Sequence, residues 1–247
     1  MLKRAFSIAL ISGFIAGLSV TAVQSVLVVP LILEAETYEQ ATSVFKLPPE
    51  VKLWVLIGHE WKHPEDEDAE EWFPGDGMER TFYTAGSNIV TGVAFALLLV
   101  GVYLVRGKPV DLNQGLLWGA AGFVVFSAAP ALVLPPELPG MTAATLGNRQ
   151  LWWFGTVIAT AIGLGLFIEK KTVLPRMVAM LLLCLPHLIG APHVFVSKSV
   201  VPAELSAQFA VSSLVSAALF WMVLGGVSGF FYQRMMHPSE TQPQPAS

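Results

Sequence analysis

Six stretches of mainly apolar residues alternate with short polar segments along the 247-residue chain. Each stretch approaches the length of about 20 apolar residues that a helix needs to cross the hydrocarbon core of a bilayer. Their approximate bounds are 5–33, 84–105, 114–134, 151–168, 177–196 and 207–232. The pattern predicts an all-α, polytopic membrane protein with about six transmembrane helices in one domain, residues 1–237.

The first apolar stretch follows Lys3 and Arg4, as the core of a secretory signal peptide would. A signal peptide has an apolar core of only about 7–15 residues and a small-residue cleavage site. This stretch is longer and no clean site follows it, so we expect an uncleaved first helix. Cleavage would leave five transmembrane helices on the same sides of the membrane.

Basic residues are concentrated in alternate connecting segments, which predicts the orientation because such segments tend to be cytoplasmic. The short outer loops carry only Arg149 and Lys198, and the long segment 34–83 falls outside with them. Both termini are then cytoplasmic. The basic residues on the cytoplasmic side are Lys3, Arg4, Arg106, Lys108, Lys170, Lys171, Arg176 and Arg234.

Composition supports a membrane protein, since 54% of residues are apolar and 13% charged, against about 25% charged in soluble domains. The acidic residues are unevenly placed: 13 of 18 lie between Glu34 and Glu79. The lone Cys184 excludes an intrachain disulfide. The sequence has no phosphate-binding loop and no nucleic-acid signature. The polar, proline-rich tail 238–247 is expected to be disordered.

The acidic outer segment contains two histidines that share one face if the segment is helical, because His59 and His63 are four residues apart. Six acidic residues follow between Glu65 and Glu71. Imidazole and carboxylate together suit cobalt, nickel or zinc. A solvated acidic face is the competing interpretation. Further candidate metal ligands at the ends of this segment are Glu34, Glu36, Asp76 and Glu79.

The same histidines form the pattern H-E-x-x-H over residues 59–63, which is typical of zinc peptidases with the glutamate as general base. The context does not suit that chemistry. Pro64 stops the helix at once, Lys62 stands between the ligands, and no third ligand helix follows. A membrane-bound zinc metallopeptidase remains an alternative, but we expect that the protein is not an enzyme.

Two histidines and two prolines interrupt the fifth apolar stretch, in the segment 186–193. Ionisable side chains at membrane depth usually face a cavity or a partner, and proline frees a carbonyl one turn back. His187 and His193 would lie about 9 Å apart along a straight helix, so they can share an ion only if the helix breaks at 190–192. A broken helix with imidazoles and free carbonyls predicts a cation site. The competing interpretation gives each imidazole a hydrogen bond to a neighbouring helix or to interfacial water.

Pairs of glycines four residues apart allow helices to approach closely in lipid. We expect these pairs to serve internal packing rather than a dimer interface, which leaves a homo-oligomer open. The pairs are Gly13 and Gly17, Gly115 and Gly119, and Gly225 and Gly229.

In the outer loop before the fourth stretch, Glu137 has Arg149 as its expected ion-pair partner.

Four segments, spread in order over most of the chain, resemble the CbtA family. They are 28–39 (VVPLILEAETYE), 72–81 running into 84–88, 134–140 followed by 149–153, and 185–193. The resemblance implies a bacterial-type inner-membrane protein that takes part in cobalt uptake. Co²⁺, or Ni²⁺ or Zn²⁺, would then be a transported ion and not a permanently bound cofactor. The resemblance also implies a partner, a small histidine-containing CbtB-like membrane subunit. A non-transporting assembly or scaffold subunit is the remaining alternative.

Overall fold

The computed structural model describes residues 1–46, 74, 75, 77–192 and 199–236, with backbone only for 40–46. All regular secondary structure in this part of the chain is helical, which confirms the all-α prediction. The elements are α1 (Leu2–Leu27), α2 (Val29–Lys46), α4 (Met78–Arg106), α5 (Leu112–Phe123), the π-helical turn η1 (Val124–Ala128), α6 (Ala129–Ala131), α7 (Leu146–Glu169), α8 (Val173–Ile189) and α9 (Ala203–Met236).

Five spans in this described part are long and apolar enough to cross a membrane: α1, α4, the combined α5 to α6 segment, α7 and α9. The sixth apolar helix, α8, has 17 residues and is therefore about 25 Å long. It begins at Val173, four residues before the predicted start, and ends at Ile189, seven residues before the predicted end. Five or six spans agree with the number predicted.

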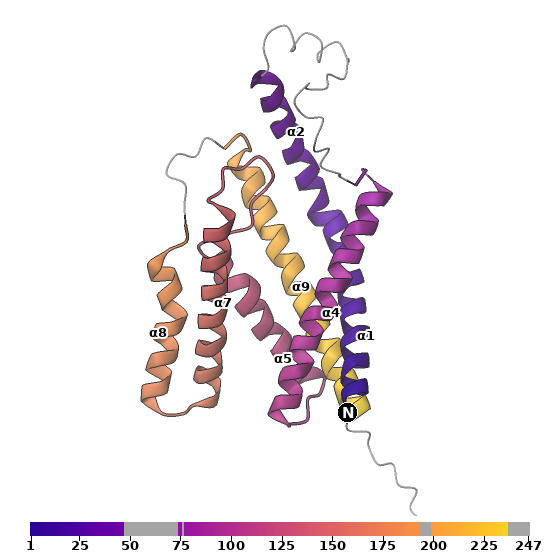
Figure 1. Cartoon of the computed structure of the whole chain (residues 1–247), viewed down its shortest axis with the longest axis vertical. Helices are drawn as coiled ribbons and strands as arrows, with labels where there is room; N and C mark the ends of the chain where they lie inside the picture. The colour runs from indigo at the N-terminus through magenta and orange to yellow at the C-terminus, as the bar shows by residue number, and fades with distance from the viewer. Residues whose placement is uncertain (47–73, 76, 193–198, 237–247) are drawn as a thin grey trace, which may run out of the picture.

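The long helices run alternately up and down, so the N-terminus and the end of α9 lie at the same end of the molecule (Figure 1). Helices α1, α4, α5 and α9 form a bundle, and α7 and α8 form an antiparallel hairpin beside it. The hairpin contacts the bundle chiefly through α7 against η1 and α6. The two parts are therefore joined close to one end of the molecule only.

Charge is segregated between the two ends. We call the end that holds the N-terminus the basic end. Its acidic residues are Asp111 and Glu169, and its basic residues are Lys3, Arg4, Arg106, Lys108, Lys170, Lys171, Arg176 and Arg234. We call the opposite end the acidic end. Its charged residues with described side chains are Glu34, Glu36, Glu39, Glu79, Glu137 and Glu204, with Arg80 and Arg149.

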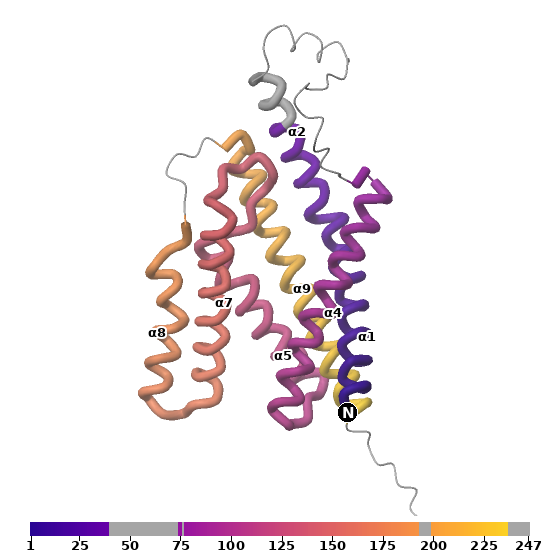
Figure 2. The backbone as a smooth tube through the Cα atoms, in the orientation of Figure 1, coloured from indigo at the N-terminus to yellow at the C-terminus, as the bar shows by residue number. Residues whose placement is uncertain are grey.

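The first predicted helix, 5–33, is interrupted at Val28, and a second helix continues into the acidic segment (Figure 2). The Val28 N–H closes α1 on the Gln24 carbonyl at 2.9 Å. Pro30 is the second residue of α2, where a missing N–H costs little. Helix α4 likewise begins at Met78 and not at Thr84. Both flanks of the acidic segment are therefore helical.

Glycines bring two helix pairs into backbone contact. A Cβ built on Gly13 would lie 2.4 Å from Cα of Val93, and one on Gly17 would lie 2.6 Å from Cα of Ile89, so α1 and α4 meet closely. The other two pairs face each other across α5 and α9: a Cβ on Gly119 would lie 2.3 Å from the Trp221 carbonyl oxygen. The predicted internal packing of the glycine pairs is confirmed.

The third span, which comprises α5, η1 and α6, changes from α-helix to π-helix just before Pro130. The Ala129 N–H donates to the Val124 carbonyl, five residues back. The wider turn accommodates the ring and the missing donor of Pro130. Beside it the Phe126 ring stacks on Trp221, with centroids 5.4 Å apart. This aromatic contact anchors the span against α9.

Candidate functional site

A cavity of about 410 Å³ lies at the acidic end of the molecule. Its walls come from the loop between α6 and α7, from Pro192 after α8, and from the first turns of α9, including Ser206 and Ala210. Two loop residues, Glu137 and Met141, give it a carboxylate and a thioether. We call it the acidic-end cavity.

The loop that forms this cavity is held in place by both apolar and polar contacts. Leu138 is 3% exposed and packs in a cluster with Val201 and Leu205. The sulfur of Met141 accepts a hydrogen bond from the Leu138 N–H at 3.2 Å and one from the Ser206 hydroxyl at 3.6 Å. The thioether therefore ties the loop to α9, and it has a fixed position in the cavity wall.

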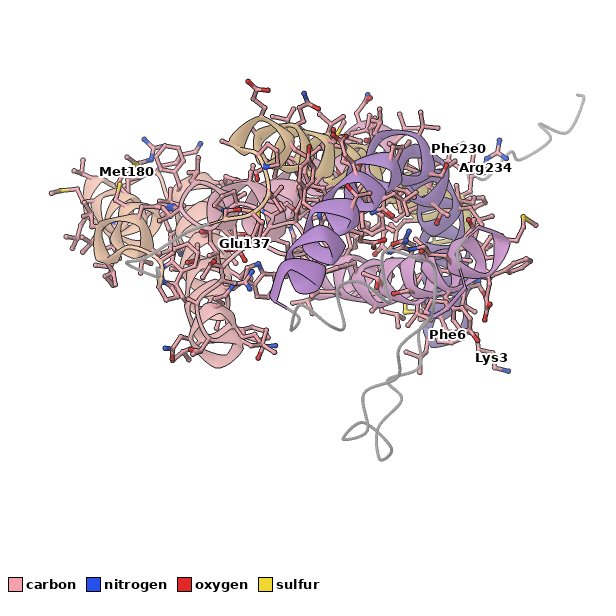
Figure 3. The ribbon with its side chains drawn as sticks, turned by 90° about the horizontal axis from the view of Figure 1, so that it is seen from above. Lys3, Phe6, Glu137, Met180, Phe230 and Arg234 are labelled. Carbon is pink, nitrogen blue, oxygen red and sulfur yellow. The ribbon has the colours of Figure 1, made fainter. Side chains whose placement is uncertain are left out.

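Glu137 forms the predicted ion pair with Arg149, with Oε2 2.7 Å from Nη2. Their side chains are 21% and 28% exposed, respectively. Glu137 Oε2 and Arg149 Nε are both buried, and neither has a hydrogen-bond partner among the described residues. The contact between Oε2 and Nη2 is therefore an ion pair without hydrogen-bond geometry. Figure 3 shows Glu137 between the bundle and the hairpin that carries Met180. The carboxylate thus lies where the two parts of the molecule meet.

His187 lies in the last turn of α8, three residues before Gly190 ends the helix with a φ of 82°. The predicted break at 190–192 is therefore the end of α8, while Pro186 stays within the helix. Nδ1 of His187 is buried and has no hydrogen-bond partner in the described part of the chain, and neither has Nε1 of Trp152 at the start of α7. The competing interpretation expects a hydrogen bond from His187 to a neighbouring helix, and Nδ1 forms none among the described residues.

Four buried polar atoms that have no hydrogen-bond partner among the described residues thus lie at the acidic end, in the hairpin and its preceding loop: Glu137 Oε2, Arg149 Nε, Trp152 Nε1 and His187 Nδ1. Buried polar atoms are nearly always hydrogen-bonded, so exceptions need an explanation. In a membrane protein, polar groups at depth commonly face a water-filled space or a substrate path. The grouping identifies this region as the candidate site.

A second polar region joins the outer parts of α1, α2 and α4. Glu36 pairs with Arg80 at 2.5 Å, with both side chains about 30% exposed. Below this pair, Asn88 donates to the Gln24 side-chain oxygen at 2.7 Å and to the Thr21 hydroxyl at 3.0 Å. Sequence analysis missed these last three residues. The signal was available, because polar side chains within apolar stretches commonly bond across helices.

The predicted metal ligands fall into two groups. Among the described ones, Glu34 is exposed on α2, Glu36 is paired with Arg80, and Glu79 accepts a hydrogen bond from the Gly75 N–H at 3.1 Å. His187 is the fourth. In the described residues no group of three or more His, Cys, Asp or Glu side chains is placed to hold a metal ion. The ligands that lie outside the described residues are His59, His63, Asp76 and His193, with the H-E-x-x-H pattern and the tail 238–247.

Residues 2–233 match the profile of a family described as "Probable cobalt transporter subunit (CbtA)". The chain belongs to the CbtA family. The resemblance seen in four sequence segments is thereby confirmed over nearly the whole chain. No curated protein and no solved structure matched in the corresponding comparisons. Membership of CbtA and the apolar helices together make this a multi-pass membrane protein of a cobalt transporter family.

Proposed function

We propose that this CbtA-family chain is the membrane subunit through which a divalent metal ion, in the first place Co²⁺, enters the cell. The acidic-end cavity is the proposed entrance. The observation that carries the proposal is the family match together with two buried atoms at the acidic end of the molecule, Glu137 Oε2 and His187 Nδ1. Neither atom has a hydrogen-bond partner among the described residues, and Glu137 has only its ion pair with Arg149.

The donors near the proposed entrance suit the ion. Glu137 offers a carboxylate oxygen, His187 an imidazole nitrogen and Met141 a thioether sulfur. Imidazole and carboxylate oxygen bind borderline divalent ions, and the thioether favours softer ones. An arriving ion would take the place of Arg149 beside Glu137, so the carboxylate keeps a cationic neighbour in both states. The Glu137 carboxylate is then never left as an unpaired buried charge, which would be strongly destabilising.

The acidic segment supplies the first step of the proposed route. Its carboxylates raise the local concentration of cations. His59, His63, Glu34, Glu36, Asp76 and Glu79 are the proposed transient ligands. The ion then passes to His187, in the last turn of α8, and to His193, which follows six residues later in the sequence. The last carbonyls of a helix lack partners within the helix and can contribute further ligands. The acidic end is the outer side in this proposal, because the basic residues of the other end favour the cytoplasm.

We further propose an inner-membrane location and a small histidine-containing CbtB-like subunit as partner. The sequence has no phosphate-binding loop, so the driving force would come from an ion gradient or from a partner ATPase. We expect no catalytic activity. A Glu60→Gln variant with unchanged function in cells would agree with transport, whereas loss of a proteolytic activity would favour the metallopeptidase.

Uptake of radiolabelled cobalt tests the proposal. Cells that express the chain with its partner should accumulate cobalt faster than cells that express the partner alone, and unlabelled Co²⁺ should compete better than Ni²⁺ or Zn²⁺. Equal accumulation in both strains would contradict a conducting role. A scaffold subunit would restore uptake even when all four histidines, 59, 63, 187 and 193, are replaced.

A further inference from the structure

A separate cavity of about 550 Å³ opens at the basic end, far along the helices from the proposed entrance. It lies between α5, which contributes Leu117, Trp118 and Ala121, and the end of α7, which contributes Ile168. Arg106, the last residue of α4, and Lys108, in the connection from α4 to α5, lie at its rim. Apolar walls are thus combined with a cationic rim.

The shape of this cavity follows from the way the hairpin is attached. Helix α7 contacts the third span through η1 and α6, and the two spans diverge from there toward the basic end (Figure 1). The wedge is closed at its top and open below. Leu117 and Ile168, on its two walls, are 71% and 64% exposed. Within the described part of the chain, the main contacts of the hairpin with the bundle therefore lie away from the basic end.

The rim of the wedge carries two positively charged side chains, Arg106 and Lys108. The guanidinium of Arg106 lies 5.0 Å from the centre of the Trp118 ring, a cation–π contact that holds it at the mouth. Neither Arg106 nor Lys108 forms an ion pair within the described part of the chain. The nearby carboxylate of Asp111 is engaged, because its Oδ1 accepts the Gln114 N–H at 2.8 Å and caps α5. Across the wedge, Glu169 at the end of α7 is followed directly by two basic residues, Lys170 and Lys171.

We propose that this wedge binds an anionic phospholipid. The phosphate would lie against Arg106 and Lys108, and an acyl chain would run between Leu117 and Ile168. Basic pockets between transmembrane helices recognise anionic head groups in this way. A soluble anion would leave the apolar walls uncovered, and a neutral lipid would leave the cationic rim without a counter-charge. A transmembrane helix of another subunit needs a groove along the whole span, but this wedge closes where α7 meets η1. The lipid would connect the hairpin to the bundle where protein contacts do not.

Native mass spectrometry of the purified full chain in detergent tests the proposal. Phosphatidylglycerol and phosphatidylcholine with the same acyl chains are the two probes. Each basic side chain beside an anionic lipid contributes on the order of 1 kcal/mol, so phosphatidylglycerol should be retained roughly tenfold to thirtyfold better. The Arg106→Gln, Lys108→Gln variant should lose this preference. Both positions are exposed, so the fold should be kept, and circular dichroism checks this.

Two further variants distinguish lipid binding in the wedge from a general electrostatic attraction of anionic lipid to the basic end. Arg234 also stacks on a ring at the basic end, 4.9 Å from the centre of Phe230, but does not line the wedge. Arg234→Gln should therefore keep the preference. Ala121→Phe fills the wedge with all charges kept, and it should lower phosphatidylglycerol retention to the level of the double variant.

Three results would overturn the proposal. One is equal retention of the two lipids by the wild-type chain, which would indicate an unselective lipid annulus. Another is an unchanged preference in the Arg106→Gln, Lys108→Gln variant. The third is evidence of another occupant, namely either complete displacement of the lipid by excess inorganic phosphate or a protein dimer that Ala121→Phe disrupts in the absence of lipid. These last outcomes would assign the wedge to a free anion or to a second copy of the chain.

Discussion

Gly115 on α5 and Gly225 on α9 approach so closely that a Cβ built on either would lie 2.3 Å from the carbonyl oxygen of the other. The two backbones are thus in direct contact, which only glycine permits at both positions. Small residues at such crossings replace the hydrophobic driving force that is missing between helices in lipid. The contact fixes the third span against α9.

Gly225→Ala should therefore push α5 and α9 apart and lower the free energy of unfolding by about 1–3 kcal/mol, the usual cost of overpacking. Gly165→Ala on α7 is the matched control, since a Cβ there meets nothing within 4 Å. That change should be neutral or slightly stabilising, because alanine favours helix. Thermal unfolding in detergent measures both. Equal midpoints for the two variants would contradict the close contact.

Asn88 on α4 joins α1 through two side-chain hydrogen bonds, to Gln24 and Thr21. Hydrogen bonds between transmembrane helices contribute about 0.6 kcal/mol each and at most about 1.7 kcal/mol. Asn88→Leu should accordingly lower unfolding stability by about 1 kcal/mol. In a double-mutant cycle, Gln24→Leu should cost little more once Asn88 is replaced. Additive losses would mean that the bond to Gln24 contributes nothing.

The Glu36 and Arg80 pair connects α2 to α4 at the acidic end. Because both side chains are partly exposed, their coupling energy should be only about 0.2–1 kcal/mol. A double-mutant cycle of Glu36→Ala and Arg80→Ala, followed by urea unfolding, measures it. If Glu36 also binds the transported ion, Glu36→Ala should slow cobalt uptake more than Arg80→Ala. The reverse order would limit Glu36 to its structural contact.

Glu137 and Arg149 allow a similar separation of roles. Both Glu137→Gln and Arg149→Gln break the ion pair, so both should lower stability. Only Glu137→Gln removes an ion ligand, and it should therefore reduce the cobalt uptake rate several-fold more than Arg149→Gln. Glu204→Gln, an exposed acid at the same end, is the control and should transport normally. Uptake rates that simply follow the loss of stability would remove Glu137 from the route.

Much of the fold follows from sequence because lipid imposes strong rules. Apolar length predicts the spans, glycine spacing predicts the close helix contacts, and Gly190 marks the end of α8. Hydropathy could not predict α2, because a helix that leaves the membrane keeps its backbone hydrogen bonds while its side chains become polar. The bounds of the first span were therefore wrong after Val28.

The candidate site was less predictable. Glu137 and Arg149 could be paired because both fall in the predicted outer loop between the third and fourth apolar stretches, although Arg149 lies in the first turn of α7. The cavity could not be predicted from the sequence, because its shape depends on the contacts by which Met141 and Leu138 hold the loop against α9. Likewise, Asn88 and Gln24 are 64 residues apart in sequence, and only the packing of α1 on α4 brings them together. His187 was recognised because an imidazole within an apolar stretch is costly, whereas the absence of a described partner for it is a property of the fold.

The most direct test of the account is the rate of radiolabelled cobalt uptake by cells that carry His187→Ala, compared with Leu188→Ala. Leu188 is the next residue on α8 and is 77% exposed, so its replacement controls for disturbance of the helix end. The account predicts at least a tenfold lower rate for His187→Ala, which corresponds to about 1.4 kcal/mol of lost ion stabilisation, and a normal rate for Leu188→Ala. Wild-type uptake by His187→Ala, at equal protein levels in the membrane, would contradict it.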